Sequence, residues 1–278
     1  MLSRNLQGWL SMPKQLALLR AWGALAAAAP LVLAAPLPAQ PVAQSVRSAD
    51  LAAWQLRFER KAFRTRSGDT LPYRLARPAR RAPHPLVLVL HGSGAMGSNN
   101  EDQLGPFAAA WAQLLDDPET APIILVPQVS RRSADYILCA GLPCASRPGP
   151  SFDSLLQLLD SFASSPAVDR NRIYLAGFSM GGSAALQLAL ARPRLIAAMT
   201  IFAPVPPPRE RIAAFKRLPL LVVHGDADNE NPFKVMRGWV GRLNRAGGHA
   251  TLWVRPQMGH QVPDDMLVDA AWRRQLLR

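Results

Sequence analysis

The residues best suited to carry out chemistry form a short segment flanked by glycines, Gly177-Phe178-Ser179-Met180-Gly181. An apolar run at residues 173–176 precedes it and a helical pattern over residues 182–191 follows it, so the serine is predicted on a turn between a strand and a helix. Such a turn pushes a hydroxyl out of the sheet, and glycines two residues to either side let the strand and the helix pass closely. The helix N-terminus also offers N–H groups to a developing oxyanion. Ser179 is therefore the candidate nucleophile.

A serine nucleophile needs a base and a group that orients the base, and both follow later in the chain. The apolar run 220–223 leads into His224-Gly225-Asp226-Ala227-Asp228, and the run 251–254 is followed by His260. His260 is the candidate base and then acid. Asp228 is its candidate orienting carboxylate, with Asp226 as the alternative. These turns leave the C-terminal ends of parallel strands, so we expect the side chains to converge at one sheet edge.

A second glycine-rich segment follows the apolar run 86–90 and reads His91-Gly92-Ser93-Gly94-Ala95-Met96-Gly97. Backbone N–H groups in such a loop are accessible to negative charge. The candidate oxyanion donors are the amides of Ser93 or Gly94, together with that of Met180. No Gly-Lys-Ser/Thr follows these glycines, which argues against a phosphate-binding loop. The histidines at the strand ends, His91 and His224, are expected to orient loops.

The elements that must position these residues alternate along the chain. Two short segments, 54–58 and 71–77, are predicted to open the fold as an antiparallel pair of strands. Repeated alternation of strand and helix then predicts parallel strands with right-handed crossovers and helices on both faces, the α/β class. Residues 46–278 are predicted to form a single domain. The buried strands are predicted at 86–90, 123–126, 173–176, 198–202, 220–223 and 251–254, and the helices at 103–115, 152–163, 182–191, 208–215, 232–246 and 265–277.

Composition excludes several classes of protein. Hydrophobic residues make up 49% and charged residues 18% of the 278 residues, which is enough apolar surface to exclude a disordered chain. Only one long uncharged stretch is present, which excludes a membrane protein with many spans. The formal net charge is +13, but the arginines are scattered with no run longer than a pair. Nucleic-acid binding needs a clustered basic face, so we expect no nucleic-acid partner.

The N-terminal residues 1–45 are predicted to be a signal peptide and a short linker. Arg4, Lys14 and Arg20 are the only charged residues before Arg47, and an alanine-rich apolar stretch follows Arg20. Prolines within and after that stretch interrupt a helix and favour a cleaved signal over a membrane anchor. We therefore expect export to the periplasm or the extracellular medium, with no stable membrane insertion after cleavage.

Two cysteines, Cys139 and Cys144, are the only ones in the chain. They are too few for a zinc site built from cysteines, and no metal site is expected. In an oxidising compartment a disulfide that closes the short loop between them is expected.

Several segments carry a resemblance to a known family. Leu90-His91-Gly92-Ser93-Gly94, residues 100–104 and Val126-Pro127-Gln128 resemble the "predicted peptidase" and carboxylesterase branch of the α/β-hydrolase superfamily. Residues 168–182 are similar both to that branch and to secreted polyhydroxybutyrate depolymerases and feruloyl-esterase-like enzymes, and His224-Gly225-x-x-Asp228 matches the acid motif of both. The resemblance spans about residues 54–278. It implies the α/β-hydrolase fold and a serine hydrolase that acts on carboxylic esters without a metal or an organic cofactor.

Spacing adds an expectation about the substrate. The connection over residues 203–219 is too short for the helical cap domain that many relatives insert there, so we expect an open site and ester substrates that include bulky or polymeric ones. Residues 129–150 are expected to form the pocket rim, with Tyr136 and Gln128 as substrate-binding residues. Two alternatives stay open at this point. One is a peptidase or amidase that uses the same triad of Ser179, His260 and Asp228, and the other is a non-catalytic binding protein that kept the fold.

Overall fold

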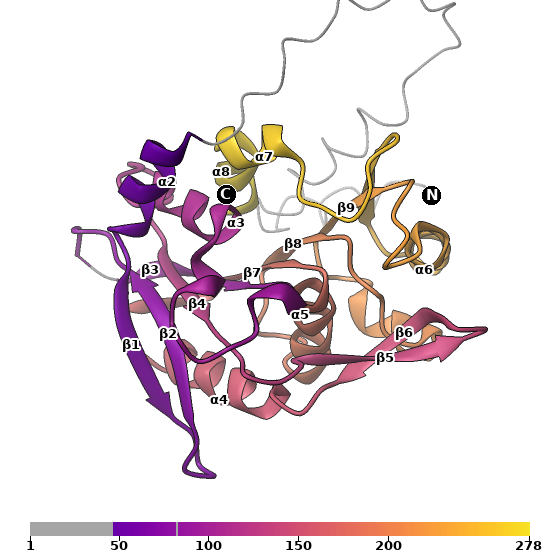
Figure 1. The fold of residues 1–278 in the computed structure, drawn as a ribbon, viewed down its shortest axis with the longest axis horizontal. Helices are drawn as coiled ribbons and strands as arrows, with labels where there is room; N and C mark the ends of the chain where they lie inside the picture. The colour runs from indigo at the N-terminus through magenta and orange to yellow at the C-terminus, as the bar shows by residue number, and fades with distance from the viewer. Residues whose placement is uncertain (1–46, 82) are drawn as a thin grey trace, which may run out of the picture.

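The computed structural model describes residues 47–81 and 83–278 (Figure 1). The predicted signal peptide and linker, residues 1–45, lie outside the described residues, so the structure does not test them. Within the described part of the chain, no helix has both the length and the apolar character needed to span a bilayer.

The centre of the fold is an eight-stranded sheet in the order β1-β2-β4-β3-β7-β8-β9-β10. β1 and β2 form an antiparallel pair that joins β4 antiparallel, and the six other strands are parallel to one another. The mostly parallel α/β sheet predicted from the sequence is thus confirmed. The strands are β1 (Glu59–Arg64), β2 (Thr70–Ala76), β3 (His84–Leu90), β4 (Ile123–Pro127), β7 (Val168–Phe178), β8 (Ala198–Phe202), β9 (Leu220–Gly225) and β10 (Ala250–Arg255).

Helices cover both faces of the sheet, and each face has its own hydrophobic core. Helices α4 (Phe152–Ala163), α5 (Met180–Ala191) and α6 (Phe233–Arg245) bury their apolar sides in one core together with the 3-10 helix η4 (Arg209–Phe215). The other core lies under α3 (Pro106–Ala109), η3 (Ala110–Leu114), α7 (Asp264–Val268) and α8 (Ala271–Leu276). Every residue of β3 is buried between these layers, which explains the continuous apolar run over its residues 86–90.

One predicted strand is wrong. The segment 54–58 lies partly in helix α2 (Ser48–Gln55), and the first strand begins only at Glu59. The alternation of Trp54, Leu56 and Phe58 suggested a strand, but Leu51 and Trp54 share the helical spacing of three residues and pack together against the core. Leu56 is left 86% exposed.

Two predicted helices are interrupted. The segment 103–115 contains the 3-10 turn η2 (Asp102–Leu104), then α3 and η3, because Pro106 lacks an N–H group and starts a new helix. The segment 265–277 divides into α7 and α8. The side chains of Trp272 and Arg273 donate hydrogen bonds of 2.8 and 2.7 Å to the carbonyl of Met266, so the break satisfies a carbonyl that a continuous helix would have bonded internally.

The sequence did not predict the hairpin formed by β5 (Ala134–Cys139) and β6 (Leu142–Pro148), a two-stranded sheet of its own. Cys139 and Cys144 form the expected disulfide near its tip. The connection after β8 contains only η4, a 3-10 helix of seven residues, so no cap domain lies there. Figure 1 shows the hairpin projecting from one side of the body.

Candidate active site

Ser179 lies on the sharp turn between β7 and α5. Its φ of 54° places a residue other than glycine in the left-handed region, and its N–H group donates a 2.8 Å hydrogen bond to the carbonyl of Phe202 on β8. A Cβ atom on Gly177 would lie 2.5 Å from the carbonyl oxygen of Gly181, and one on Gly181 would collide with the carbonyl of Leu90. The two glycines therefore allow the strand, the turn and the helix to pack closely enough to hold the serine in this conformation.

The structure brings Ser179, His260 and Asp228 together from three loops. The Nε2 atom of His260 is 2.8 Å from the hydroxyl of Ser179, and its Nδ1 atom is 2.8 Å from the Oδ2 atom of Asp228. Ser179 and Asp228 are each only 6% exposed. Within one connected set of hydrogen bonds, the imidazole can accept a proton from the hydroxyl while the carboxylate holds its other nitrogen.

The carboxylate of Asp228 is held by four donors. Its Oδ1 atom accepts the N–H groups of Glu230 and Asn231, both at 2.9 Å, and its Oδ2 atom faces His260 and His224. Burial opposes the charge, but the hydrogen bonds from His224, His260 and the Asn231 amide hold the pKa of Asp228 well below its usual range. The carboxylate is therefore charged at neutral pH, as an orienting acid must be.

The alternative acid, Asp226, has a different role. Its side chain is on the exposed turn after β9, and its Oδ1 atom accepts a 2.7 Å hydrogen bond from the N–H group of Gln257. A Cβ atom on Gly225 would collide with the carbonyl of Met258, so the two loops are packed against each other at this point. Asp226 thus ties down the turn that precedes His260 and makes no hydrogen bond to the imidazole in the described structure.

The other two histidines at strand ends hold loops, as the sequence suggested. The N–H group of Val129 donates a 3.1 Å hydrogen bond to His91 Nε2, so His91 Nδ1 carries the proton that is donated to the Gly92 carbonyl at 2.7 Å. Burial lowers the pKa of His91, which keeps this arrangement neutral. The fully buried His224 places Nε2 2.9 Å from the carbonyl of Asn231 and 3.1 Å from Asp228 Oδ2.

The glycine-rich loop after β3 lies beside the serine. A Cβ atom on Gly92 would be 3.0 Å from the ring of Phe178 and 3.6 Å from the Cβ atom of Ser179, so the missing side chain brings the loop close to the turn. The backbone N–H groups of Ser93, Gly94 and Met180 have no hydrogen-bond acceptor within residues 47–81 and 83–278. All three predicted oxyanion donors thus lie on segments adjacent to Ser179 with their N–H groups available.

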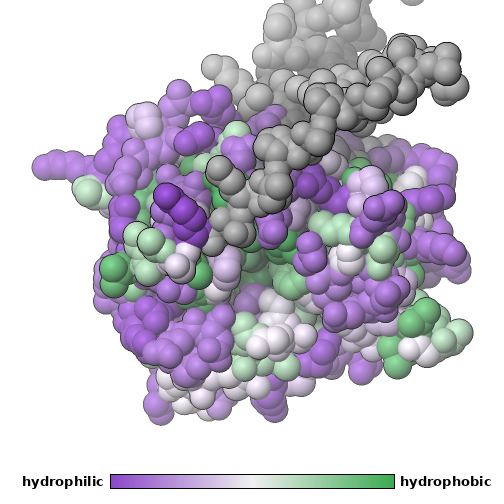
Figure 2. Space-filling model, turned by 45° about the horizontal axis from the view of Figure 1, so that its top comes forward, coloured by the Kyte–Doolittle hydropathy of each residue, from purple (hydrophilic) through white to green (hydrophobic). Residues whose placement is uncertain are grey.

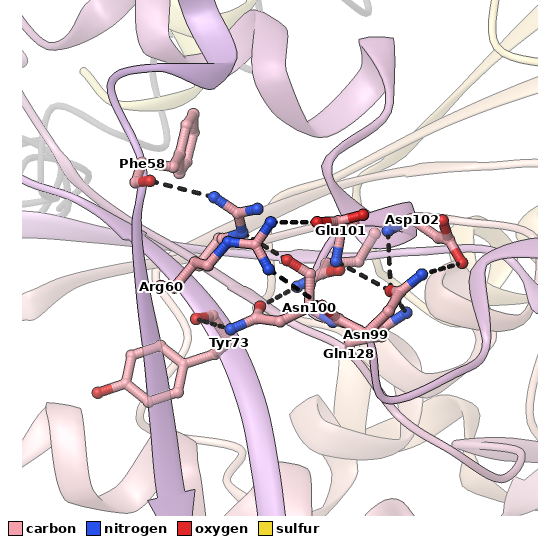
Figure 3. Close-up of polar contacts among 10 residues, drawn as sticks. Phe58, Arg60, Tyr73, Asn99, Asn100, Glu101, Asp102 and Gln128 are labelled. Carbon is pink, nitrogen blue, oxygen red and sulfur yellow. Dashed lines mark hydrogen bonds and ion pairs between the residues drawn. The ribbon is translucent and has the colours of Figure 1, made fainter.

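This loop is anchored by a polar network that sequence reasoning missed. Figure 3 shows Asn99, Asn100 and Gln128 turned toward one another between the loop and the edge strands. The Oε1 atom of Gln128 accepts the N–H group of Asn100 at 2.6 Å, and its Nε2 atom donates to the carbonyl of Ala95 and to Asn99 Oδ1. The backbone adds a 3.0 Å bond from Gly97 N–H to the carbonyl of Val129.

The position of Gln128 corrects the prediction that it binds substrate. Its side chain has no exposed surface, and both of its polar atoms are bonded to the loop. The network continues outward through Asn100, whose Nδ2 atom donates to the carbonyls of Lys61 and Tyr73 and whose carbonyl accepts from Arg74. The sequence did contain one sign of this network: two asparagines, residues 99–100, follow the glycine-rich loop, and asparagine side chains often form hydrogen bonds to nearby backbone.

Replacing Gln128 with leucine should slow turnover more than it weakens substrate binding. The loop would lose its anchor near the predicted oxyanion donors, and loss of one such donor costs about 10²–10³ in kcat, so we expect kcat to fall about 10- to 100-fold with KM changed less than about threefold. Steady-state kinetics on a soluble ester measures both. Gln157→Leu is the matched control, since Gln157 accepts a backbone N–H group far from the site. A rise in KM alone would show that Gln128 does not act on the loop.

The other predicted substrate residue, Tyr136, lies on β5. The guanidinium of Arg132 is 4.6 Å from the centre of its ring, and the residue is half-buried. No contact in the described structure joins it to Ser179 or His260, so a role in substrate binding stays a prediction. The hairpin base reaches the loop after β8 through a 2.7 Å hydrogen bond from Ser146 N–H to the carbonyl of Pro206.

Comparison with known proteins agrees with this fold. The Phospholipase/Carboxylesterase family model matches residues 149–272, a segment that contains Ser179, Asp228 and His260. The chain is 30% identical to the esterase-named protein NocK of Nocardia uniformis subsp. tsuyamanensis over 174 residues, which are 60% of this chain and 48% of NocK. A rice (Oryza sativa subsp. japonica) protein named as a carboxylesterase is 25% identical over 196 residues, 65% of this chain and 83% of the rice protein.

Among solved structures, the crystal structure of a thermostable esterase superposes with a TM-score of 0.66 at 26% identity, covering 74% of this chain and 56% of that chain. The chain therefore spans about half the length of NocK and of the thermostable esterase. Together, the sheet order, the serine turn after β7 and these matches show that the chain has the α/β-hydrolase fold and is similar to carboxylesterase-like members of that superfamily.

Proposed function

We propose that this protein is a serine esterase that hydrolyses carboxylic esters through an acyl-enzyme intermediate. One observation carries the proposal: the imidazole of His260 lies 2.8 Å from both the Ser179 hydroxyl and the Asp228 carboxylate. The esterase names of NocK and of the thermostable esterase support the ester as the bond that is cleaved.

In the first half of the reaction, the Ser179 hydroxyl attacks the ester carbonyl carbon while His260 Nε2 takes the hydroxyl proton. Asp228 stabilises the imidazolium through its bond to Nδ1. The negative charge on the former carbonyl oxygen is stabilised by N–H groups of the loop after β3 and by that of Met180. The tetrahedral intermediate then breaks its bond to the alcohol oxygen, and His260 donates the proton to the departing alkoxide.

In the second half, His260 removes a proton from water as the water attacks the acyl carbon. The bond to Ser179 Oγ breaks, the proton returns to the serine through His260, and the carboxylic acid leaves. One water is consumed per ester, one alcohol and one acid are released, and the free enzyme is regenerated.

The bond that is cleaved is tested with matched esters and amides of the same acyl group. The proposal expects kcat/KM for an aryl or short-chain ester to exceed that for the matching amide by at least about 10³, because an alkoxide is the better leaving group. Comparable values would identify an amidase or peptidase instead. No turnover of either series would favour a binding protein that kept the fold.

We also propose that the protein is exported and that its site is open to bulky or polymeric esters. The charge pattern of residues 1–45 and the Cys139–Cys144 disulfide support export, since disulfides persist in oxidising compartments. The short connection after β8 supports an open site. Fractionation of cells that express the full chain tests whether the protein is exported. Release of soluble acid from a polyester suspension tests whether the site accepts polymeric esters.

Substitution of Glu230 should change the preference for substrate charge. Its Oε2 atom lies 3.8 Å from His260 Nε2 and its side chain is 72% exposed, so it places negative charge next to the reacting atoms. Glu230→Gln is expected to raise kcat/KM for an anionic ester about two- to fivefold relative to a neutral ester of the same shape, with a smaller effect at high salt. Glu119→Gln, which removes an exposed acid paired with Arg278, is the control. An unchanged ratio in Glu230→Gln would contradict this role.

A further inference from the structure

The tip of the β5–β6 hairpin is an apolar projection from the body. Residues 137–145 contain no charged side chain, and Ile137, Leu138 and Leu142 are 39%, 62% and 53% exposed. These three account for nearly half of the large hydrophobic side chains that are exposed in the described part of the chain. Figure 2 shows hydrophobic side chains at the outer end of the molecule on the side where Figure 1 places the hairpin. Apolar groups gathered in this way mark interaction surfaces.

The hairpin holds these side chains away from the body. The Cys139–Cys144 disulfide closes the tip, and the base is fixed by the backbone bond from Ser146 to Pro206 and by a 2.9 Å hydrogen bond from Gln187 Nε2 to the Ser146 carbonyl. On this fixed base, Leu138 and Leu142 stay more than half exposed. The apolar surface is thus preorganised for a partner outside the chain, which lowers the entropy cost of binding.

Positive charge surrounds the hairpin base. Arg131 precedes β5, Arg147 lies near the end of β6, and Arg211 lies on η4; none of the three pairs with a carboxylate within residues 47–81 and 83–278. The acids at this base are already paired, Asp135 with Arg132 and Glu210 with Arg209. The base of the hairpin therefore carries guanidinium groups without a carboxylate partner, while its tip carries no charged side chain.

A cavity beside the hairpin also combines an apolar surface with guanidinium groups. It has a volume of about 560 Å³ and lies between β6, α5 and η4. Its wall is apolar at Phe152, Leu190 and Pro208, and it carries the side chains of Arg147 and Arg211 together with Glu210. Guanidinium groups beside an apolar wall suit a phosphate ester that carries a hydrocarbon chain.

From these observations we propose that the hairpin docks this protein reversibly on an anionic phospholipid bilayer. Leu138 and Leu142 enter the boundary between headgroups and acyl chains, and Arg131, Arg147 and Arg211 face the lipid phosphates. Without Arg4, Lys14 and Arg20 of the predicted signal peptide, the formal net charge falls from +13 to +10, which still adds long-range attraction to an anionic bilayer. Because the hairpin tip offers only three exposed large apolar side chains, the binding is weak and exchanges rapidly, in contrast to a membrane anchor. This inference does not depend on the catalytic role of the triad.

The experiment is co-sedimentation of the purified protein with vesicles of phosphatidylcholine alone and of an equimolar mixture of phosphatidylcholine and phosphatidylglycerol. We expect binding to the mixed vesicles that weakens as salt is raised. The double variant Leu138→Ser/Leu142→Ser should bind at least about tenfold more weakly. Arg147→Gln/Arg211→Gln should lose most of the preference for the anionic vesicles. Leu56→Ser, at an 86% exposed leucine away from the hairpin, is the matched control and should bind like the unchanged protein.

Circular dichroism and the melting temperature, expected to be unchanged in all three variants, establish that each variant is folded. The proposal is overturned if the unchanged protein binds neither type of vesicle, if the hairpin variant binds as well as the unchanged protein, or if Leu56→Ser weakens binding to the same extent. Adsorption to a polyester film without binding to vesicles would also overturn it and would assign the tip to a polymer surface.

Discussion

Ser179→Ala and His260→Ala are each expected to lower kcat for ester hydrolysis by about 10⁵- to 10⁶-fold. The first removes the attacking oxygen, and the second removes the group that accepts its proton at a distance of 2.8 Å. Because the two side chains act as one unit, the double variant should lose little more activity than either single one. Steady-state rates on one soluble ester, with the melting temperature of each variant recorded, provide the measurement.

The matched control for the histidine is His249→Ala, since His249 is an exposed residue in the turn before β10. It should retain full activity. If the losses in Ser179→Ala and His260→Ala multiplied in the double variant, the two residues would act independently, and the proposed proton transfer between them would be wrong.

Asp228→Asn is expected to lower kcat about 10⁴-fold, the loss that this substitution causes in Ser-His-Asp triads. The carboxylate accepts hydrogen bonds from His260, His224 and two backbone N–H groups. An asparagine side chain retains one acceptor oxygen and presents an amide donor in place of the other. The imidazole would then adopt the tautomer that cannot accept the serine proton. Kinetics of the variant at several pH values measures the effect.

The neighbouring substitution Asp226→Asn separates the two candidate acids. Asp226 accepts only the Gln257 N–H group in the described structure, a bond that the asparagine carbonyl can still accept, so we expect kcat to remain within about threefold of the unchanged protein. A loss in Asp226→Asn as large as that in Asp228→Asn would reverse the assignment of the acid.

Much of the site could be predicted because its constraints are local in the sequence. Gly177, Gly181 and Gly225 each lie where a Cβ atom would meet backbone at 2.5 Å or closer, so only glycine fits and the motif is visible in the chain. The buried parallel strands are equally visible, because a strand covered on both faces must be apolar at every position. The order of serine, acid and histidine then follows from which strand ends meet at one edge.

Two sequence predictions, substrate binding by Gln128 and a strand at residues 54–58, were wrong because the direction of a side chain depends on packing against distant parts of the chain. Gln128 follows a buried strand toward the site, but its amide turns inward to Ala95 and Asn100, some thirty residues earlier in the chain. The apolar residues Trp54, Leu56 and Phe58 alternate as in a strand, but Trp54 packs on the core from helix α2 while Leu56 is exposed. Neither outcome can be derived from local pattern alone, since each depends on what covers the surface.

The most direct test of the account is the site of covalent modification by a fluorophosphonate, which mimics the tetrahedral intermediate and reacts with activated serines. After incubation with the native protein, peptide mass spectrometry should find the label on Ser179 alone. The label should be strongly reduced in His260→Ala and absent from protein that was unfolded beforehand. Failure of the native protein to react, or a label on a different serine while Ser179 stays unmodified, would contradict the proposal that His260 activates Ser179.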